Sequence, residues 1–163
     1  MAVMARMKLS NTNRPIECFR LWRDDECGLL MDAPYQRGDV WGTKRRVNLI
    51  RSVLLEVPIP SIIINDRGSA DWSDDYRVAV IDGRQRITTL LRFIDGQLRV
   101  PGAWFGVDSE TVSYSDLSIS EQRRFRQTPV AVSEGRLATL EEEQEVFDLV
   151  NFGGLAQGER DDK

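Results

Sequence analysis

The sequence predicts an α+β domain, a small sheet with helices packed against it. Helical and β-branched segments alternate along the 163 residues, and no segment repeats. Hydrophobic residues make up 41% of the chain and charged residues 29%, which is typical of a folded globular domain. We therefore expect a single domain over residues 16–157, preceded by a flexible start over residues 1–15 and followed by a charged tail over residues 158–163.

Apolar residues at helical spacing predict two long helices. In residues 43–56 they recur at steps of three and four, and we expect the basic side chains to fall mostly off this apolar stripe: Lys44, Arg45, Arg46 and Arg51. Residues 85–95 have one apolar face, and Gly96 follows where a glycine commonly ends a helix. Residues 17–23 predict a shorter helix.

Two capping boxes predict the starts of two more helices. Ser118 with Glu121 opens a basic helix, and Thr139 with Glu142 opens a helix that stops near Asn151. We interpret the acidic run over residues 141–145 as a solvated helix face. Runs of β-branched and apolar residues predict strands, the second of them buried on both faces: residues 29–33, 59–65, 76–81, 98–100 and 129–133.

The composition excludes several classes of function. The chain has no histidine, which removes Ser-His-Asp and Cys-His catalysis and His-ligated zinc. Its net charge of −4 is not the overall basic footprint of a strong nucleic-acid binder, although a local basic patch is compatible with it. No apolar run is long enough to span a membrane, so we expect a cytoplasmic protein of a bacterial cell or a phage-infected host, without a membrane partner.

The strongest chemical signal is a predicted strand, tight turn and helix start at residues 78–94. A helix N-terminus presents unpaired N–H groups, Gly83 allows close approach of a ligand, and Arg84 and Arg86 suit phosphate. Asp82 could hold Mg²⁺, polarise a water molecule or cap the helix. The simpler alternative is that Asp82 is only the N-cap and the arginines are solvated.

Two other segments carry weaker signals. Residues 34–41 gather Tyr35, Gln36, Arg37 and Trp41 without periodicity, which is typical of a binding loop, although an ordinary turn with a core tryptophan explains it equally well. Residues 147–154 end on Asn151 and two glycines, and taken alone this is a helix stop.

Together these segments resemble one family. The order Tyr-Gln-Arg … Trp, helix, Pro-Ile-Pro, strand, Ile-Asp-Gly-x-Gln-Arg-x-Thr-Thr-Leu and Phe-x-x-x-Asn-x-Gly-Gly is similar to the N-terminal domain of GmrSD-type modification-dependent restriction enzymes. The resemblance covers residues 19–159. It implies the ParB/sulfiredoxin-like fold, a small mixed sheet flanked by helices.

The resemblance also implies a nucleotide site. The family motif D-G-Q-Q-R, which supports binding and hydrolysis of nucleoside triphosphates, falls on residues 82–86. Asp82 would then hold Mg²⁺, Gln85 would orient the attacking water, and Arg86 would hold phosphate. Further nucleotide contacts are expected at Tyr35, Gln36, Arg37, Gly83, Arg84, Thr88 and Asn151. We also expect the loop over residues 35–41 to fold over the start of the second long helix, with Arg37 and Arg86 in one pocket.

This sequence departs from the family in three ways. Gly38-Asp39 stands where the family usually has Pro-Tyr after Tyr-Gln-Arg. Arg84 replaces the first glutamine of the motif, which adds charge and affects hydrolysis more than phosphate binding. The 163 residues do not contain the family's long helical remainder or its histidine-dependent nuclease partner, and we therefore expect a short, stand-alone form of the kind found in phages or mobile elements.

Three functions remain open. The first is a nucleotide-dependent enzyme or switch, hydrolysing or transferring phosphate, in a DNA-modification, restriction or anti-restriction context. The second is a metal-dependent DNA endonuclease, which needs clustered carboxylates, whereas only Asp82 stands at a motif position. The third is a non-catalytic regulator or decoy of a restriction complex. The expected partners are a nucleoside triphosphate with Mg²⁺, DNA or a restriction-system protein, and a second copy in a homodimer.

Overall fold

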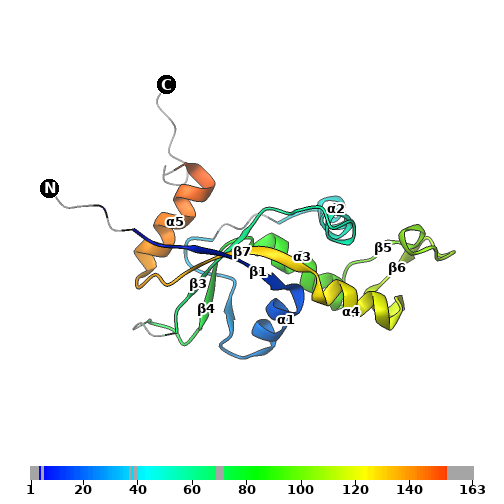
Figure 1. Cartoon of the computed structure of the whole chain (residues 1–163), viewed down its shortest axis with the longest axis horizontal. Helices are drawn as coiled ribbons and strands as arrows, with labels where there is room; N and C mark the ends of the chain where they lie inside the picture. The colour runs from blue at the N-terminus through cyan, green and yellow to red at the C-terminus, as the bar shows by residue number, and fades with distance from the viewer. Residues whose placement is uncertain (1–3, 5, 37, 39, 69–71, 154–163) are drawn as a thin grey trace, which may run out of the picture.

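The computed structural model describes residues 4, 6–36, 38, 40–68 and 72–153. In this part of the chain the main sheet is mixed and has the strand order β1-β7-β3-β4-β2 (Figure 1). β3 runs parallel to β7 and antiparallel to β4, while β1 is antiparallel to β7 and β2 is parallel to β4. The strands are β1 (Ser10–Pro15), β2 (Leu29–Leu30), β3 (Ile62–Asp66), β4 (Val78–Asp82) and β7 (Pro129–Gly135). A separate hairpin pairs β5 (Val100–Pro101) with β6 (Thr111–Val112). The α+β prediction is therefore confirmed.

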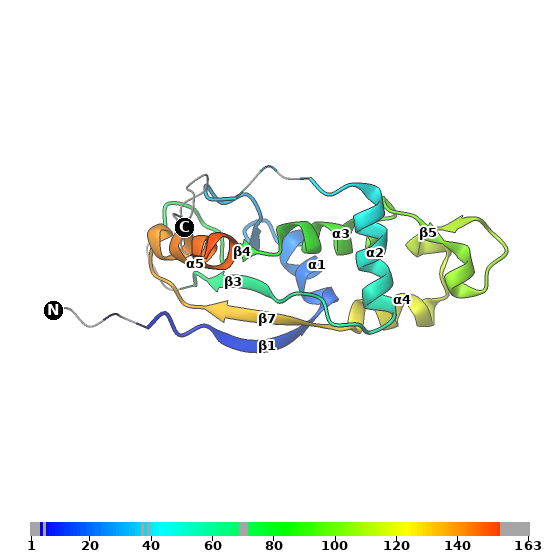
Figure 2. The same cartoon turned by 90° about the horizontal axis from the view of Figure 1, so that it is seen from above.

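Helices cover both faces of the sheet. They are α1 (Ile16–Asp24), α2 (Thr43–Leu54), α3 (Arg84–Ile94), α4 (Ile119–Gln127) and α5 (Leu140–Phe152), with 3₁₀ turns at Gly102–Phe105 and Tyr114–Asp116. The first four share the larger core, whereas α5 stands at the other end of the molecule from α2 and α4 (Figures 1 and 2).

Side chains of the central strands alternate between two cores. Ile62 and Ile64 of β3 belong to the larger core with Val80 of β4, while Ile63 packs on the smaller core, which contains Ile81 and residues of α5. Because successive strand residues face opposite sides of a sheet, both faces of these strands are covered. The prediction of a strand buried on both faces is confirmed, although β3 begins at Ile62 rather than at residue 59.

The helix boundaries follow the sequence signals closely. α2 and α3 occupy the two segments of helical periodicity. Ser118 accepts a hydrogen bond from the Glu121 N–H, and Thr139 accepts one from the Glu142 N–H, both at 3.2 Å. Gly96 follows α3 with a φ of +75°, as a glycine after a helix should.

The sequence prediction for residues 1–15 is wrong for residues 10–15. These residues form β1, which pairs with β7 from Ser10 opposite Glu134 to Pro15 opposite Pro129. Their side chains are polar and mostly exposed, so no apolar alternation marked the strand; its pairing with a segment more than 110 residues away supplies the hydrogen bonds. β2 is shorter than predicted, since only two residues pair with β4.

The predicted charged tail over residues 158–163 lies outside the described residues. Within the described part of the chain, no helix is long and apolar enough to cross a membrane.

Candidate functional site

The turn between β4 and α3 is built around a glycine. Gly83 has a φ of +103°, and a Cβ at this position would lie 2.9 Å from Ile62 Cγ1. Both the left-handed backbone and the close approach to β3 therefore require glycine. Next to this turn the register between β3 and β4 shifts, because Ile63 pairs with Asp82 and Ile64 with Val80, which leaves Ile81 of β4 as the extra residue.

A cleft of about 520 Å³ opens at this turn. Its walls are residues 82–86, the loop before α2 with Gln36 and residues 40–42, Arg45 of α2, and Phe147, Val150 and Asn151 of α5. The volume lies within the usual range for small-molecule sites, about 300–1,000 Å³. The three sequence segments that carried a chemical signal thus meet in one place.

Asp82 and Arg86 form an ion pair at the base of the cleft. Arg86 Nη2 donates to Asp82 Oδ2 at 3.0 Å and to the Ser61 carbonyl at 3.0 Å. Arg86 Nε is buried and has no hydrogen-bond partner among the described residues. Arg84 pairs with Asp32 at 2.5 Å. The alternative of an N-capping aspartate with solvated arginines is wrong, because Gly83 is the N-cap residue of α3 and both arginines are paired.

Gln85 is hydrogen-bonded to the buried Arg46, which we expected to lie off the apolar face of α2. Gln85 Oε1 accepts hydrogen bonds from Arg46 Nη2 at 2.9 Å and from the Trp41 N–H at 3.3 Å. Arg46 is only 3% exposed, so it does not fall off the apolar stripe of α2. The spacing contained this signal, since Ile50 and Val53 follow Arg46 by four and seven residues and lie on the same buried face.

The loop before α2 is fixed to the end of β4. Gln36 Nε2 donates to the carbonyls of Val80 at 2.6 Å and Ile81 at 2.9 Å. The predicted folding of this loop against the start of α3 is confirmed for Trp41, whose N–H bonds to Gln85, whereas Gln36 is bonded to β4 and lines the same cleft. Arg37, which we expected in the same pocket as Arg86, lies outside the described residues.

Tyr35 and Thr88 do not line the cleft, contrary to expectation. Tyr35 is 6% exposed and its hydroxyl donates to Glu143 Oε2 at 3.0 Å. Burial first, and then the negative charge of Glu143, raise the pKa of Tyr35 above its ordinary value. Thr88 stands one turn into α3, beyond the residues that form the wall.

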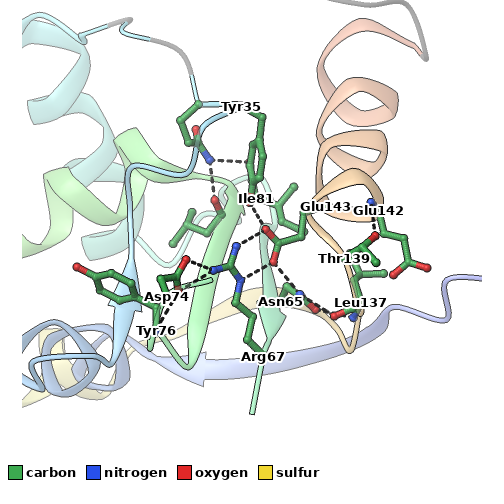
Figure 3. A network of polar contacts seen from close by, with 12 residues as sticks. Tyr35, Asn65, Arg67, Asp74, Tyr76, Ile81, Leu137, Thr139, Glu142 and Glu143 are labelled. Carbon is green, nitrogen blue, oxygen red and sulfur yellow. Dashed lines mark hydrogen bonds and ion pairs between the residues drawn. The ribbon is translucent and has the colours of Figure 1, made fainter. Parts of the chain in front are cut away.

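A buried polar network surrounds Glu143 of α5 (Figure 3). Glu143 Oε1 accepts from Asn65 Nδ2 at 2.7 Å and from Arg67 Nε at 2.8 Å, and Oε2 accepts from Arg67 Nη2 at 2.7 Å. Arg67 Nη1 also donates to both oxygens of Asp74, at 3.0 and 2.9 Å. Burial is the largest single influence and lowers the pKa of Arg67, but the hydrogen bonds and negative charges of Glu143 and Asp74 together raise it above its ordinary value. The network joins α5, the end of β3 and the loop that carries Tyr35.

The interpretation of residues 141–145 as a solvated face is therefore wrong for Glu143. This side chain is fully buried, whereas Glu141 and Glu145 are exposed. Glu143 precedes Val146 and Phe147 by three and four residues, which places it on the buried face of α5. The run of acidic residues concealed this spacing.

The charges at the cleft favour an anion. Arg45, Arg84 and Arg86 line it, and Asp82 is the only acidic side chain among the described residues that do. The Arg45 guanidinium carbon lies 4.2 Å above the centre of the Trp41 ring. The first N–H groups of α3 also point toward this end of the helix, where Gly83 provides no side-chain cap. The arrangement can bind phosphate or carboxylate groups.

Comparison with known families agrees with the motif order. The model of the GmrSD restriction endonuclease N-terminal domain matches residues 23–161. A comparison with curated proteins finds no match.

Proposed function

This chain belongs to the family of the GmrSD restriction endonuclease N-terminal domain, and from that premise we propose that it binds a nucleoside triphosphate in the cleft between β4, α3 and α5. The family membership gives a restriction-system context. We assign the nucleotide site to seven residues that were predicted from the sequence and that line the cleft: Gln36, Asp82, Gly83, Arg84, Gln85, Arg86 and Asn151.

The observation that most supports the proposal is the state of Arg86. Its side chain is 13% exposed, and its buried Nε has no acceptor among the described residues. Leaving a buried donor of a charged group without a partner is costly, by about 1–3 kcal/mol or more. Arg86 lines the cleft at the N-terminus of α3, where anions are favoured, and a turn of its side chain toward a bound phosphate would give this donor an acceptor.

The residues of the cleft fit Mg²⁺ only when the ion is also bound by the phosphates of a nucleotide. No group of three or more carboxylate, thiol or imidazole ligands occurs in the described part of the chain. Mg²⁺ is commonly held by one or two carboxylates together with substrate phosphates and water, and Asp82 offers one carboxylate. When bound, the ion would neutralise charge on the phosphates. The same donor set gives no support to a metal-dependent nuclease with a protein-bound metal cluster.

Binding without turnover is a second candidate, and the contacts of Gln85 favour it. A carbonyl oxygen has two lone pairs, and Gln85 Oε1 already accepts from Trp41 and Arg46. Its oxygen is therefore engaged in holding the loop, rather than in orienting an attacking water. A regulator that responds to nucleotide fits this geometry.

The test is nucleotide-dependent stability followed by phosphate release. Thermal unfolding is measured with each of the four nucleoside triphosphates, with and without Mg²⁺, for the wild type, Arg86→Ala and Arg84→Ala. A ligand at 100 times its Kd adds about 2.7 kcal/mol of stability. We expect stabilisation of the wild type that both variants lose, while Arg123→Ala, an exposed residue of α4, keeps it.

Two results would overturn the proposal: no stabilisation of the wild type by any nucleotide, or undiminished stabilisation of both cleft variants. Arg84→Ala guards against a folding defect of Arg86→Ala, because Arg84 is partly exposed. Phosphate release then separates the two candidates, since a regulator binds without releasing phosphate.

A further inference from the structure

Arg46 of α2 binds three groups on two segments that contribute walls to the cleft, the loop before α2 and the helix α3. Its Nε donates to the Trp41 carbonyl at 3.2 Å, Nη1 to Thr89 Oγ1 at 2.7 Å and Nη2 to Gln85 Oε1 at 2.9 Å. The Trp41 N–H donates to the same Gln85 oxygen. Both backbone polar groups of Trp41 are thus bound, one to Arg46 and the other to a partner of Arg46.

Burial of the charged Arg46 side chain is energetically unfavourable at this position. Arg46 is 3% exposed, and its three acceptors are all neutral; no carboxylate of the described residues contacts it. Burial first, and then the positive charge of Arg92, lower the pKa of Arg46. A buried charge without a counter-charge destabilises a fold, and its helix neighbours on the same face are apolar. Stability alone would favour an apolar side chain here.

The guanidinium of Arg46 instead fixes the relative positions of the groups that it binds. Its planar fork reaches one acceptor on the loop and two on α3, which a lysine or an apolar residue cannot do. The loop contributes Val40, Trp41 and Gly42 to the cleft, and α3 contributes Gln85 and its neighbours. The contacts of Arg46 therefore set the distance between these two walls.

We propose that Arg46 is a positioning residue, which locks residues 40–42 onto the first turns of α3 and so keeps the cleft in its ligand-binding shape. The part of this inference that concerns ligand affinity rests on the proposed nucleotide function. The part that concerns the loop does not, because the contacts exist without any ligand.

The first experiment measures the loop without nucleotide. Amide hydrogen exchange of residues 40–42 is compared in the wild type, Arg46→Met, Arg46→Lys and Arg51→Met. Arg51 is the control, because it is exposed on the same helix and does not line the cleft. We expect exchange at residues 40–42 to rise about ten-fold or more in Arg46→Met and Arg46→Lys, as the loss of bonds to a charged group implies. Exchange in β4 of the Arg46 variants, and exchange at residues 40–42 of Arg51→Met, should stay at the wild-type rate.

The second experiment measures the affinity for ATP with Mg²⁺ by calorimetry. We expect both Arg46 variants to bind about ten-fold more weakly or worse, and Arg51→Met to bind as the wild type does. Wild-type affinity in Arg46→Lys would show that the charge suffices, and would overturn the argument from the planar fork.

The remaining outcomes are distinguishable. Unchanged exchange at residues 40–42 in Arg46→Met overturns the proposal, and so does a rise that extends equally to β4, because Arg46 would then support the whole fold. A local rise with unchanged ATP affinity shows that the anchored loop does not serve the site, and overturns it too. If the wild type binds no nucleotide, the proposed function fails together with the affinity claim, whereas the exchange result still decides whether Arg46 anchors the loop.

Discussion

Replacing Glu143 with glutamine should destabilise the protein strongly, although the residue lies in a run of acidic side chains. The two oxygens of Glu143 accept four hydrogen bonds, from Tyr35, Asn65 and twice from Arg67. Glutamine has nearly the same shape but carries no charge and loses one acceptor. Among the described residues, the side chain of Arg67, 1% exposed, then keeps only Asp74 as a counter-charge. Breaking a buried ion pair from one side costs about 3–5 kcal/mol.

Equilibrium unfolding in urea measures this loss. With an m-value of about 2 kcal/mol/M, the midpoint of Glu143→Gln should fall by roughly 2 M. Glu145→Gln is the matched control on the same helix; Glu145 is exposed, and its stability change should stay within about 0.5 kcal/mol. A loss below about 1 kcal/mol in Glu143→Gln, or an equal loss in both variants, would refute the reasoning from burial.

Two further predictions concern the turn and the tyrosine. Gly83→Ala should destabilise the fold by about 1–3 kcal/mol because of the positive φ, and further because the added Cβ clashes with Ile62. It should therefore lower the melting temperature more than Gly96→Ala, where φ is also positive but no atom lies within 4 Å of the added Cβ. Equal losses in the two variants would contradict the close approach of Gly83 to Ile62. The raised pKa of Tyr35 keeps its phenol protonated in the folded state, while the unfolded chain ionises it near about pH 10. Stability should therefore fall as the pH rises above about 10, and less steeply in Tyr35→Phe; identical slopes in urea unfolding would count against this.

The motif at residues 82–86 shows which parts of the site can be predicted from local sequence. The strand, the glycine turn and the helix start were all predictable, because each depends on residues that are neighbours in the chain. The ion pair of Asp82 with Arg86 is also local, since residues four apart in a helical turn lie side by side. The role of Tyr35 was not predictable in this way, because its partner Glu143 is 108 residues away.

The amino-acid sequence by itself determined the α2 and α3 helices, the two capped helix starts, the turn at Gly83 and the family, since periodicity, capping and motif order are properties of neighbouring residues. Only the tertiary structure decided that Ser10–Pro15 is a strand, and that Arg46 and Glu143 are buried rather than solvated. The physical reason is the same in each case. A polar backbone edge or a charged side chain is stable in its place only through partners brought there by the fold, and those partners are distant in the sequence.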